Sequence, residues 1–234
     1  MTNTLHRYSD HYAPDRRAGV RPVENDYIVF AMSSRNLNDD NLVEKYRTFA
    51  RLALRHNPVN VGDATKGGFY RPQQKLNPFA HWKREQKPDP ERLIQDIEGH
   101  TTVAAVFKTY EDMKGFVRDL READLGISIN ISAPMDAARR CCEELGIRRH
   151  SVEYSLGFQG RVERLPDNTV LEISTMCGHG MVSHNLAKKL VDWIKEGRRN
   201  PEEATKYLAR FCICGVFNTA RAQELFERAR VGAS

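Results

Sequence analysis

The chain has 234 residues, 40% of them hydrophobic, which is sufficient for one large domain with its own core. The formal net charge of +5 comes from 36 basic and 31 acidic residues that are mixed along most of the chain, so charge alone does not indicate a nucleic-acid-binding protein. The five cysteines include an adjacent pair and a pair separated by one residue, which argues against a disulfide framework and favours thiol or metal chemistry.

The first 25 residues are polar and show neither a helical nor a strand period. They lack the apolar run of a signal peptide, and no later stretch approaches the roughly 18 apolar residues of a membrane span. We therefore expect a cytoplasmic protein without membrane contact, in which residues 1–25 form an arm and residues 26–234 form a single domain.

The next segment opens with an apolar run at residues 26–34 that is typical of a buried strand, followed by a helical period that Asn38 caps. Residues 60–90 then combine a glycine pair, prolines, aromatic and basic residues without a sustained period, which predicts a long irregular loop. Such loops are often lids or binding loops. Both this loop and the arm are candidate contacts with a second copy of the chain.

Strand and helix patterns alternate through the middle of the chain. Strands are expected at 103–107, 126–132 and 150–158, and Thr109 and Pro134 open the two intervening helices. Two further extended runs, at 161–165 and 170–175, flank a Pro-Asp-Asn turn and predict a hairpin. The sequence thus predicts an α/β fold with a mixed, largely parallel β-sheet, flanking helices and a helical carboxy-terminal segment.

The carboxy-terminal part, residues 177–234, carries three cysteines between its expected helices, which lie at 185–196, from Asn200 onward, and at 219–230. Cys177 follows a predicted strand, and Cys212 and Cys214 fall between the second and third helices. A helical hairpin of this length returns the chain to its starting end. We therefore expect Cys177 to lie near Cys212 and Cys214.

Three thiolates in one place are a soft-metal site, and a [4Fe-4S] cluster is the first expectation, with zinc as the alternative. Paired zinc ligands usually stand two to four residues apart, whereas both pairs here are separated by one residue. A cluster held by three cysteines leaves one iron open as a Lewis acid. The sequence therefore predicts an iron–sulfur enzyme that performs lyase or sulfur chemistry on a small anionic substrate.

Other residues receive roles within this hypothesis. His179 and His184 are candidates for a fourth ligand or for a general acid and base. Lys66, Arg71 and Arg35 are candidates for binding the substrate anion.

Three alternatives stay open. The cysteines could hold a structural zinc in a module whose basic, aromatic loop contacts RNA or a protein. Cys177 could be a nucleophile activated at a helix amino terminus, with His179 or His184 as its base. Finally, the thiols could be small apolar fillers, which is the role assigned to Cys141 and Cys142.

Overall fold

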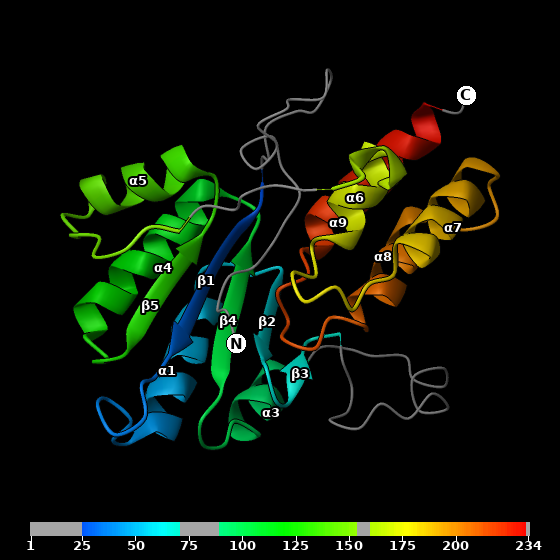
Figure 1. The fold of residues 1–234 in the computed structure, drawn as a ribbon. Coiled ribbons are helices and arrows are strands. Elements are labelled where there is room, and N and C mark those ends of the chain that lie inside the picture. Colours follow the sequence, from blue (N-terminus) through cyan, green and yellow to red (C-terminus); the bar gives the residue numbers. More distant parts are fainter. Residues whose placement is uncertain (1–24, 71–88, 154–159, 233–234) are drawn as a thin grey trace.

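The computed structural model describes residues 25–70, 89–153 and 160–232, and Figure 1 shows their arrangement. The described strands form one five-stranded sheet in the order β3-β2-β4-β1-β5. Their bounds are β1 (Tyr27–Met32), β2 (Asn60–Asp63), β3 (Gly67–Gly68), β4 (Thr102–Phe107) and β5 (Ser128–Ser132). The first group of helices is α1 (Leu42–Leu54), α3 (Pro90–Gln95), α4 (Tyr110–Ala123) and α5 (Met135–Glu144). The second group is the short 3-10 helix η2 (Val162–Arg164), α6 (Asn168–Ser174), α7 (His184–Lys195), α8 (Pro201–Ala209) and α9 (Thr219–Val231).

All pairings in the described sheet are antiparallel, so the expectation of a largely parallel sheet is wrong. The helices α1 and α4 do connect strands that run in the same direction, namely β1 to β2 and β4 to β5. However, β4 lies between β1 and β2, and β1 lies between β4 and β5. Each of the two units, β1-α1-β2 and β4-α4-β5, therefore has a strand of the other unit between its own two strands, which is the split β-α-β arrangement.

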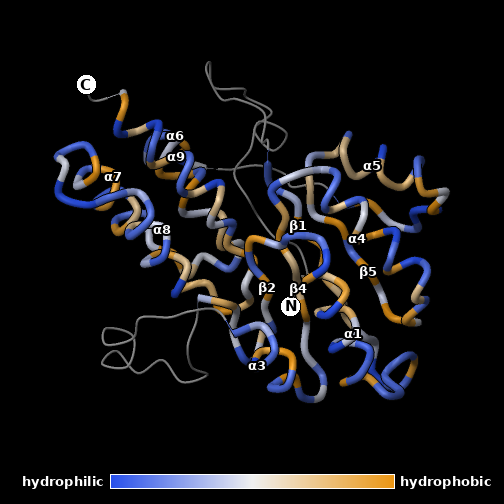
Figure 2. Tube along the Cα trace, turned by 180° about the vertical axis from the view of Figure 1, so that it is seen from behind, coloured by the Kyte–Doolittle hydropathy of each residue, from blue (hydrophilic) through white to orange (hydrophobic). Residues whose placement is uncertain are grey.

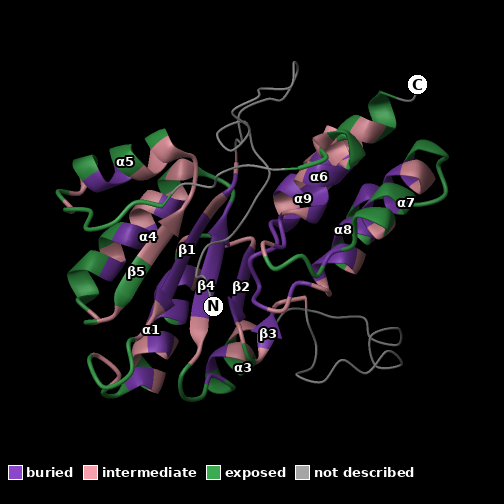
Figure 3. Ribbon diagram, viewed as in Figure 1, coloured by how far each residue is buried: buried purple, intermediate pink, exposed green. Residues whose placement is uncertain are grey.

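The two faces of the sheet build two separate hydrophobic cores. Val29, Ala31 and Val103 point to the face covered by α1, α3, α4 and α5, whereas Ile28 and Val106 point to the face covered by α6–α9. This follows from the two-residue period of strands. Figure 2 shows hydrophobic colours concentrated on β1 and β4, while the helices alternate with hydrophilic residues. In Figure 3, β2 and β4 are largely buried and the edge strand β5 is not.

The region that was predicted to form a hairpin is helical. The side chain of Asp167 accepts a hydrogen bond from the backbone N–H of Val170, which is how an N-cap residue begins a helix. The Pro-Asp-Asn sequence that was predicted to be a hairpin turn therefore begins α6, and Cys177 follows a helix rather than a strand. Residues 161–165 contain η2, residues 150–153 contain no strand, and residues 154–159 lie outside the described part.

The expected loop at 60–90 is ordered at both ends, where it forms β2, β3 and the start of α3. Its centre, residues 71–88, lies outside the described residues, as does the arm up to residue 24. The last three helices were predicted nearly to the residue, and the side chains of Asn200 and Asn218 cap α8 and α9. Among the described helices, none combines the length and apolarity needed to cross a lipid bilayer.

Candidate metal centre

Two loops of the helical layer bring three cysteines together. Cys177 lies in the loop between α6 and α7, and its thiol hydrogen-bonds with that of Cys212 from the loop between α8 and α9. The Sγ atoms of Cys212 and Cys214 are 3.9 Å apart, and Cys214 Sγ lies 3.5 Å from Nδ1 of His179. We call these four residues the thiol cluster. The predicted meeting of the three cysteines is thus observed as contacts between their side chains.

The cluster lies at the edge of the hydrophobic core shared by the sheet and α6–α9. Cys177 and Cys212 are each 1% exposed and Cys214 is 5% exposed, whereas His179 is exposed. Apolar side chains, including Met176 and Phe217, belong to the same core. Solvent therefore reaches the cluster from the side of His179.

The loop that carries Cys177 and His179 is a tight turn closed by local hydrogen bonds. The N–H of Gly180, which has a φ of 69°, donates to the carbonyl of Cys177 at 3.0 Å. At the base of the loop, Ser174 Oγ and His184 Nδ1 are 2.7 Å apart and join the end of α6 to the start of α7. Because Ser174 also donates to the Val170 carbonyl, the imidazole N–H is the donor in this pair. His184 thus braces the loop through Ser174 rather than through a thiol.

The loop that carries Cys212 and Cys214 presses directly on the backbone of β2 and β3. A Cβ atom on Gly62 would lie 2.5 Å from the Cys214 carbonyl oxygen, and one on Gly68 would lie 2.6 Å from Cα of Gly215. Gly215 itself has a φ of 71°, a left-handed conformation that other residues rarely adopt. This contact is not predictable from the sequence, because glycines about 150 residues away from a cysteine loop carry no local signal of such packing.

Polar contacts fix the same loop to the strands. Asn60 Nδ2 donates to the Phe217 carbonyl at 3.0 Å. Asn218 Nδ2 donates to the Asn25 carbonyl at 2.8 Å and to Asp26 Oδ1 at 3.0 Å, while its Oδ1 caps α9. These buried bonds hold the position of Cys212 and Cys214 relative to the sheet, because leaving such groups unpaired would be costly.

Burial and contact with other thiols favour the protonated form of Cys177 and Cys212. The hydrogen bond with Cys212 and burial raise the pKa of Cys177 far above the ordinary value for a thiol. The hydrogen bond from Cys177 lowers the pKa of Cys212, but the bond with Cys214 and burial outweigh it and raise that pKa to about 12. A negative charge on any one of these sulfurs is therefore unfavourable unless a cation lies beside it.

Backbone N–H groups nevertheless point at two of the sulfurs. The N–H groups of Met181 and His179 act on Cys177 and lower its pKa, and the N–H of Val216 acts in the same way on Cys212. Hydrogen bonds from N–H groups favour the thiolate over the thiol. Such bonds are also one of the means by which proteins support metal-bound sulfur.

The thiol cluster is a line of contacts rather than a cage. Cys177 contacts Cys212, Cys212 contacts Cys214, and Cys214 contacts His179. In residues 25–70, 89–153 and 160–232, no group of three or more histidine, cysteine, aspartate or glutamate side chains is already arranged to hold a metal ion. Binding an ion would therefore require removal of the thiol protons and rearrangement of the side chains.

Of the three expected anion-binding residues, the structure describes Lys66 and Arg35. Lys66 Nζ forms a 2.7 Å ion pair with Glu98, which raises the pKa of the lysine and satisfies its charge. Arg35 is exposed in the turn after β1, and Arg71 lies outside the described residues.

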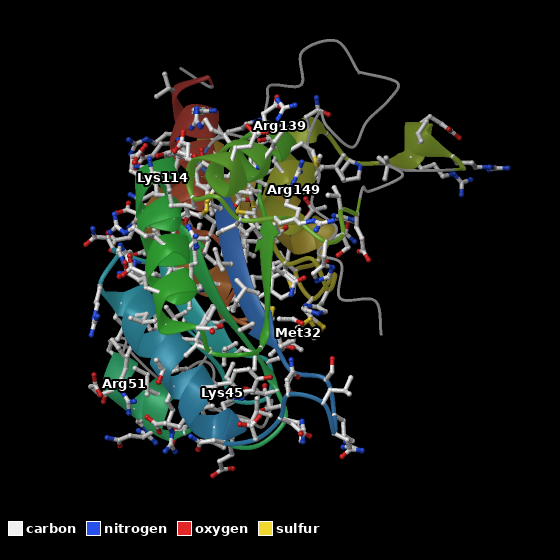
Figure 4. The ribbon with its side chains drawn as sticks, turned by 90° about the vertical axis from the view of Figure 1, so that its left-hand side faces the viewer. Met32, Lys45, Arg51, Lys114, Arg139 and Arg149 are labelled. Carbon is white, nitrogen blue, oxygen red and sulfur yellow. The ribbon has the colours of Figure 1, made fainter. Side chains whose placement is uncertain are left out.

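The basic residues labelled in Figure 4 lie on several elements. Figure 4 shows labelled cations spread over α1, α4, α5 and the segment that follows α5. Four of these five cations have acidic partners, in the pairs Lys45–Asp40, Arg51–Glu44, Lys114–Glu111 and Arg139–Asp136. Residues 71–88, which contain five basic residues and one acidic residue, lie outside the described part.

The chain matches no protein-family model, no curated protein and no solved structure. The thiol cluster is therefore the feature of the molecule from which a function can be inferred.

Proposed function

We propose that this protein binds a thiophilic metal ion through Cys177, Cys212 and Cys214, and that the ion joins the two loops of the helical layer. The observation that carries the proposal is the contact of three buried cysteines from two loops separated by two helices. Free cysteines are often buried singly, but three joined in a line of contacts, with N–H donors aimed at two of them, suit a cation better than apolar packing.

A bound metal cation would also compensate the negative charge that is otherwise unfavourable on the buried sulfurs. The raised pKa values of Cys177 and Cys212 reflect burial and the proximity of other thiols. A bound cation reverses this effect, because a coordinating thiol is deprotonated outright. The same raised pKa values argue against Cys177 as a nucleophile, since a thiol that is 1% exposed and protonated neither reaches a substrate nor attacks it.

An iron–sulfur cluster is the second candidate occupant. Three cysteines in an apolar setting with N–H groups directed at sulfur are features that such clusters share. Lyase chemistry on a small anion receives less support, because the charge of Lys66, one of the expected anion-binding residues, is already paired with Glu98.

Metal analysis under reducing conditions tests the proposal. The protein is purified without oxygen from cells supplied with iron and zinc, and its iron, zinc and acid-labile sulfide are measured beside Cys177→Ser, Cys212→Ser and Cys214→Ser. Cys142→Ser is the matched control, because Cys142 is equally a buried thiol but lies on α5. We expect stoichiometric metal in the wild type and the control and its loss in the three cluster variants. A wild type that also takes up no metal on reconstitution would contradict the proposal.

A further inference from the structure

We infer that the thiol cluster forms a closed, four-ligand site for one zinc ion, with His179 as the fourth ligand beside Cys177, Cys212 and Cys214. This inference rests on the proposed function and adds the identity of the ion, the number of ligands and the role of the ion.

The two measured distances in the cluster are those of a tetrahedral site. With Zn–S bonds of about 2.3 Å and Zn–N bonds of about 2.0–2.1 Å, tetrahedral angles place two sulfurs about 3.8 Å apart and a sulfur and a nitrogen about 3.5 Å apart. The Cys212–Cys214 sulfurs are 3.9 Å apart, and Cys214 Sγ is 3.5 Å from His179 Nδ1. Two edges of the tetrahedron are therefore formed before any ion binds.

The same distances favour one ion over a cluster. In a [4Fe-4S] cluster each cysteine binds a different iron, so its sulfurs stand farther apart than two ligands of a single ion. Cys212 would have to separate from both Cys177 and Cys214 to admit a cubane. The backbone of its loop is held against Gly62 and Gly68, which leaves little room for such a movement.

The two loops contribute equally to the site, each through a pair of ligands separated by one residue. Cys177 and His179 come from one loop, and Cys212 and Cys214 come from the other. Each loop has a glycine with positive φ directly after its second ligand, Gly180 in one and Gly215 in the other. This left-handed residue turns the chain sharply, as a loop that wraps one ion requires.

A closed ligand set also gives the ion its role. Four protein ligands leave no coordination position for substrate, which is the property of structural rather than catalytic zinc. His179 is the exposed member and covers the side from which solvent reaches the sulfurs. The ion therefore acts as a cross-link that fastens the α6–α7 loop to the α8–α9 loop, and through it to β2 and β3.

Cobalt substitution tests the fourth ligand. The reduced, chelator-treated full chain is titrated with Co²⁺ and then with Zn²⁺ in competition with a chromophoric chelator, for the wild type, His179→Ala, His179→Cys and His150→Ala. His150→Ala is the matched control, because His150 is also an exposed histidine but lies in the segment after α5, outside both cysteine loops. We expect the wild type and the control to give the visible absorption of tetrahedral cobalt with thiolate ligands.

His179→Ala should weaken zinc binding by at least about tenfold and change the cobalt spectrum, whereas His179→Cys should restore affinity and strengthen the thiolate-to-cobalt band. If His179→Ala binds both ions like the control, or if the protein takes up iron and sulfide instead of zinc, the inference is overturned while the proposed function stands. If the wild type takes up neither zinc or cobalt nor iron with sulfide, both fail.

Discussion

The five cysteines occupy two settings that differ in what surrounds the sulfur. Cys141 and Cys142 lie on α5, where burial raises the pKa of Cys141 to about 11. The cysteines of the thiol cluster lie in loops, where sulfur contacts sulfur and backbone N–H groups point at Cys177 and Cys212. A helix uses its own N–H groups in its hydrogen-bond ladder, so a cysteine within it packs as a small apolar side chain. In a loop those groups are available to a thiolate.

Removing a cluster thiol should have the largest effect. Cys212→Ser should abolish the rise in melting temperature that zinc gives the reduced protein, because the affinity of a structural site contributes directly to folding. Cys142→Ser should retain this rise. Thermal unfolding of both variants with zinc and with a chelator measures the difference. If both variants respond to zinc as the wild type does, the two settings are not functionally distinct.

A methyl group added at Gly62, where β2 contacts the cysteine loop, should have the second-largest effect. Gly62→Ala places a Cβ against the Cys214 carbonyl and Gly215, so we expect a loss of about 1–3 kcal/mol of stability and weaker zinc binding. Gly232→Ala is the control, since its Cβ meets only ordinary contact at the end of α9. Urea unfolding and zinc competition on both variants give the comparison. Equal zinc affinity in the two would show that the loop does not depend on its contact with β2.

The raised pKa of Cys212 should also make the free energy of unfolding depend on pH. Because the pKa of Cys212 is about 12 in the folded chain and 9.0 without such surroundings, the unfolded chain loses its thiol proton first as pH rises. In the presence of chelator, stability from this group is therefore complete below pH 9 and is lost between pH 9 and about 12. Urea unfolding across this range should show a steeper decline for the wild type than for Cys212→Ala. Parallel curves would contradict the raised pKa.

The α5 cysteines should give the smallest effect. Cys141→Ala removes a buried sulfur from an apolar core and should cost about 1 kcal/mol without any change in metal content. Urea unfolding together with metal analysis checks both parts. A loss of metal in this variant would extend the site to α5 and end the distinction between the two settings.

Much of the helical part was predictable because its signals are local. The caps at Thr109 and Asn200 and the apolar period located four helices, and the return of the helical hairpin placed Cys177 beside Cys212. The sheet was not predictable in the same way. A helix between two strands shows that they run in the same direction, but not whether another strand lies between them.

Other parts of the site also escaped prediction. Residues 170–175 alternate like a strand, and the Asp167 cap that makes them helical resembles a turn. The contact of Gly62 and Gly68 with the cysteine loop depends on packing between distant segments. His184 was indistinguishable from His179 in the sequence, because only the folded loop shows which imidazole faces a thiol.

Counting the protons released on zinc binding tests the central claim most directly. Calorimetric titration of the reduced chain with Zn²⁺ near neutral pH, in buffers of different ionisation enthalpy, reports both the stoichiometry and the protons displaced. The account predicts one zinc per chain and the release of one proton from each of Cys177, Cys212 and Cys214, since metal ligation requires thiolates. No saturable uptake of zinc, or uptake without proton release, would contradict it.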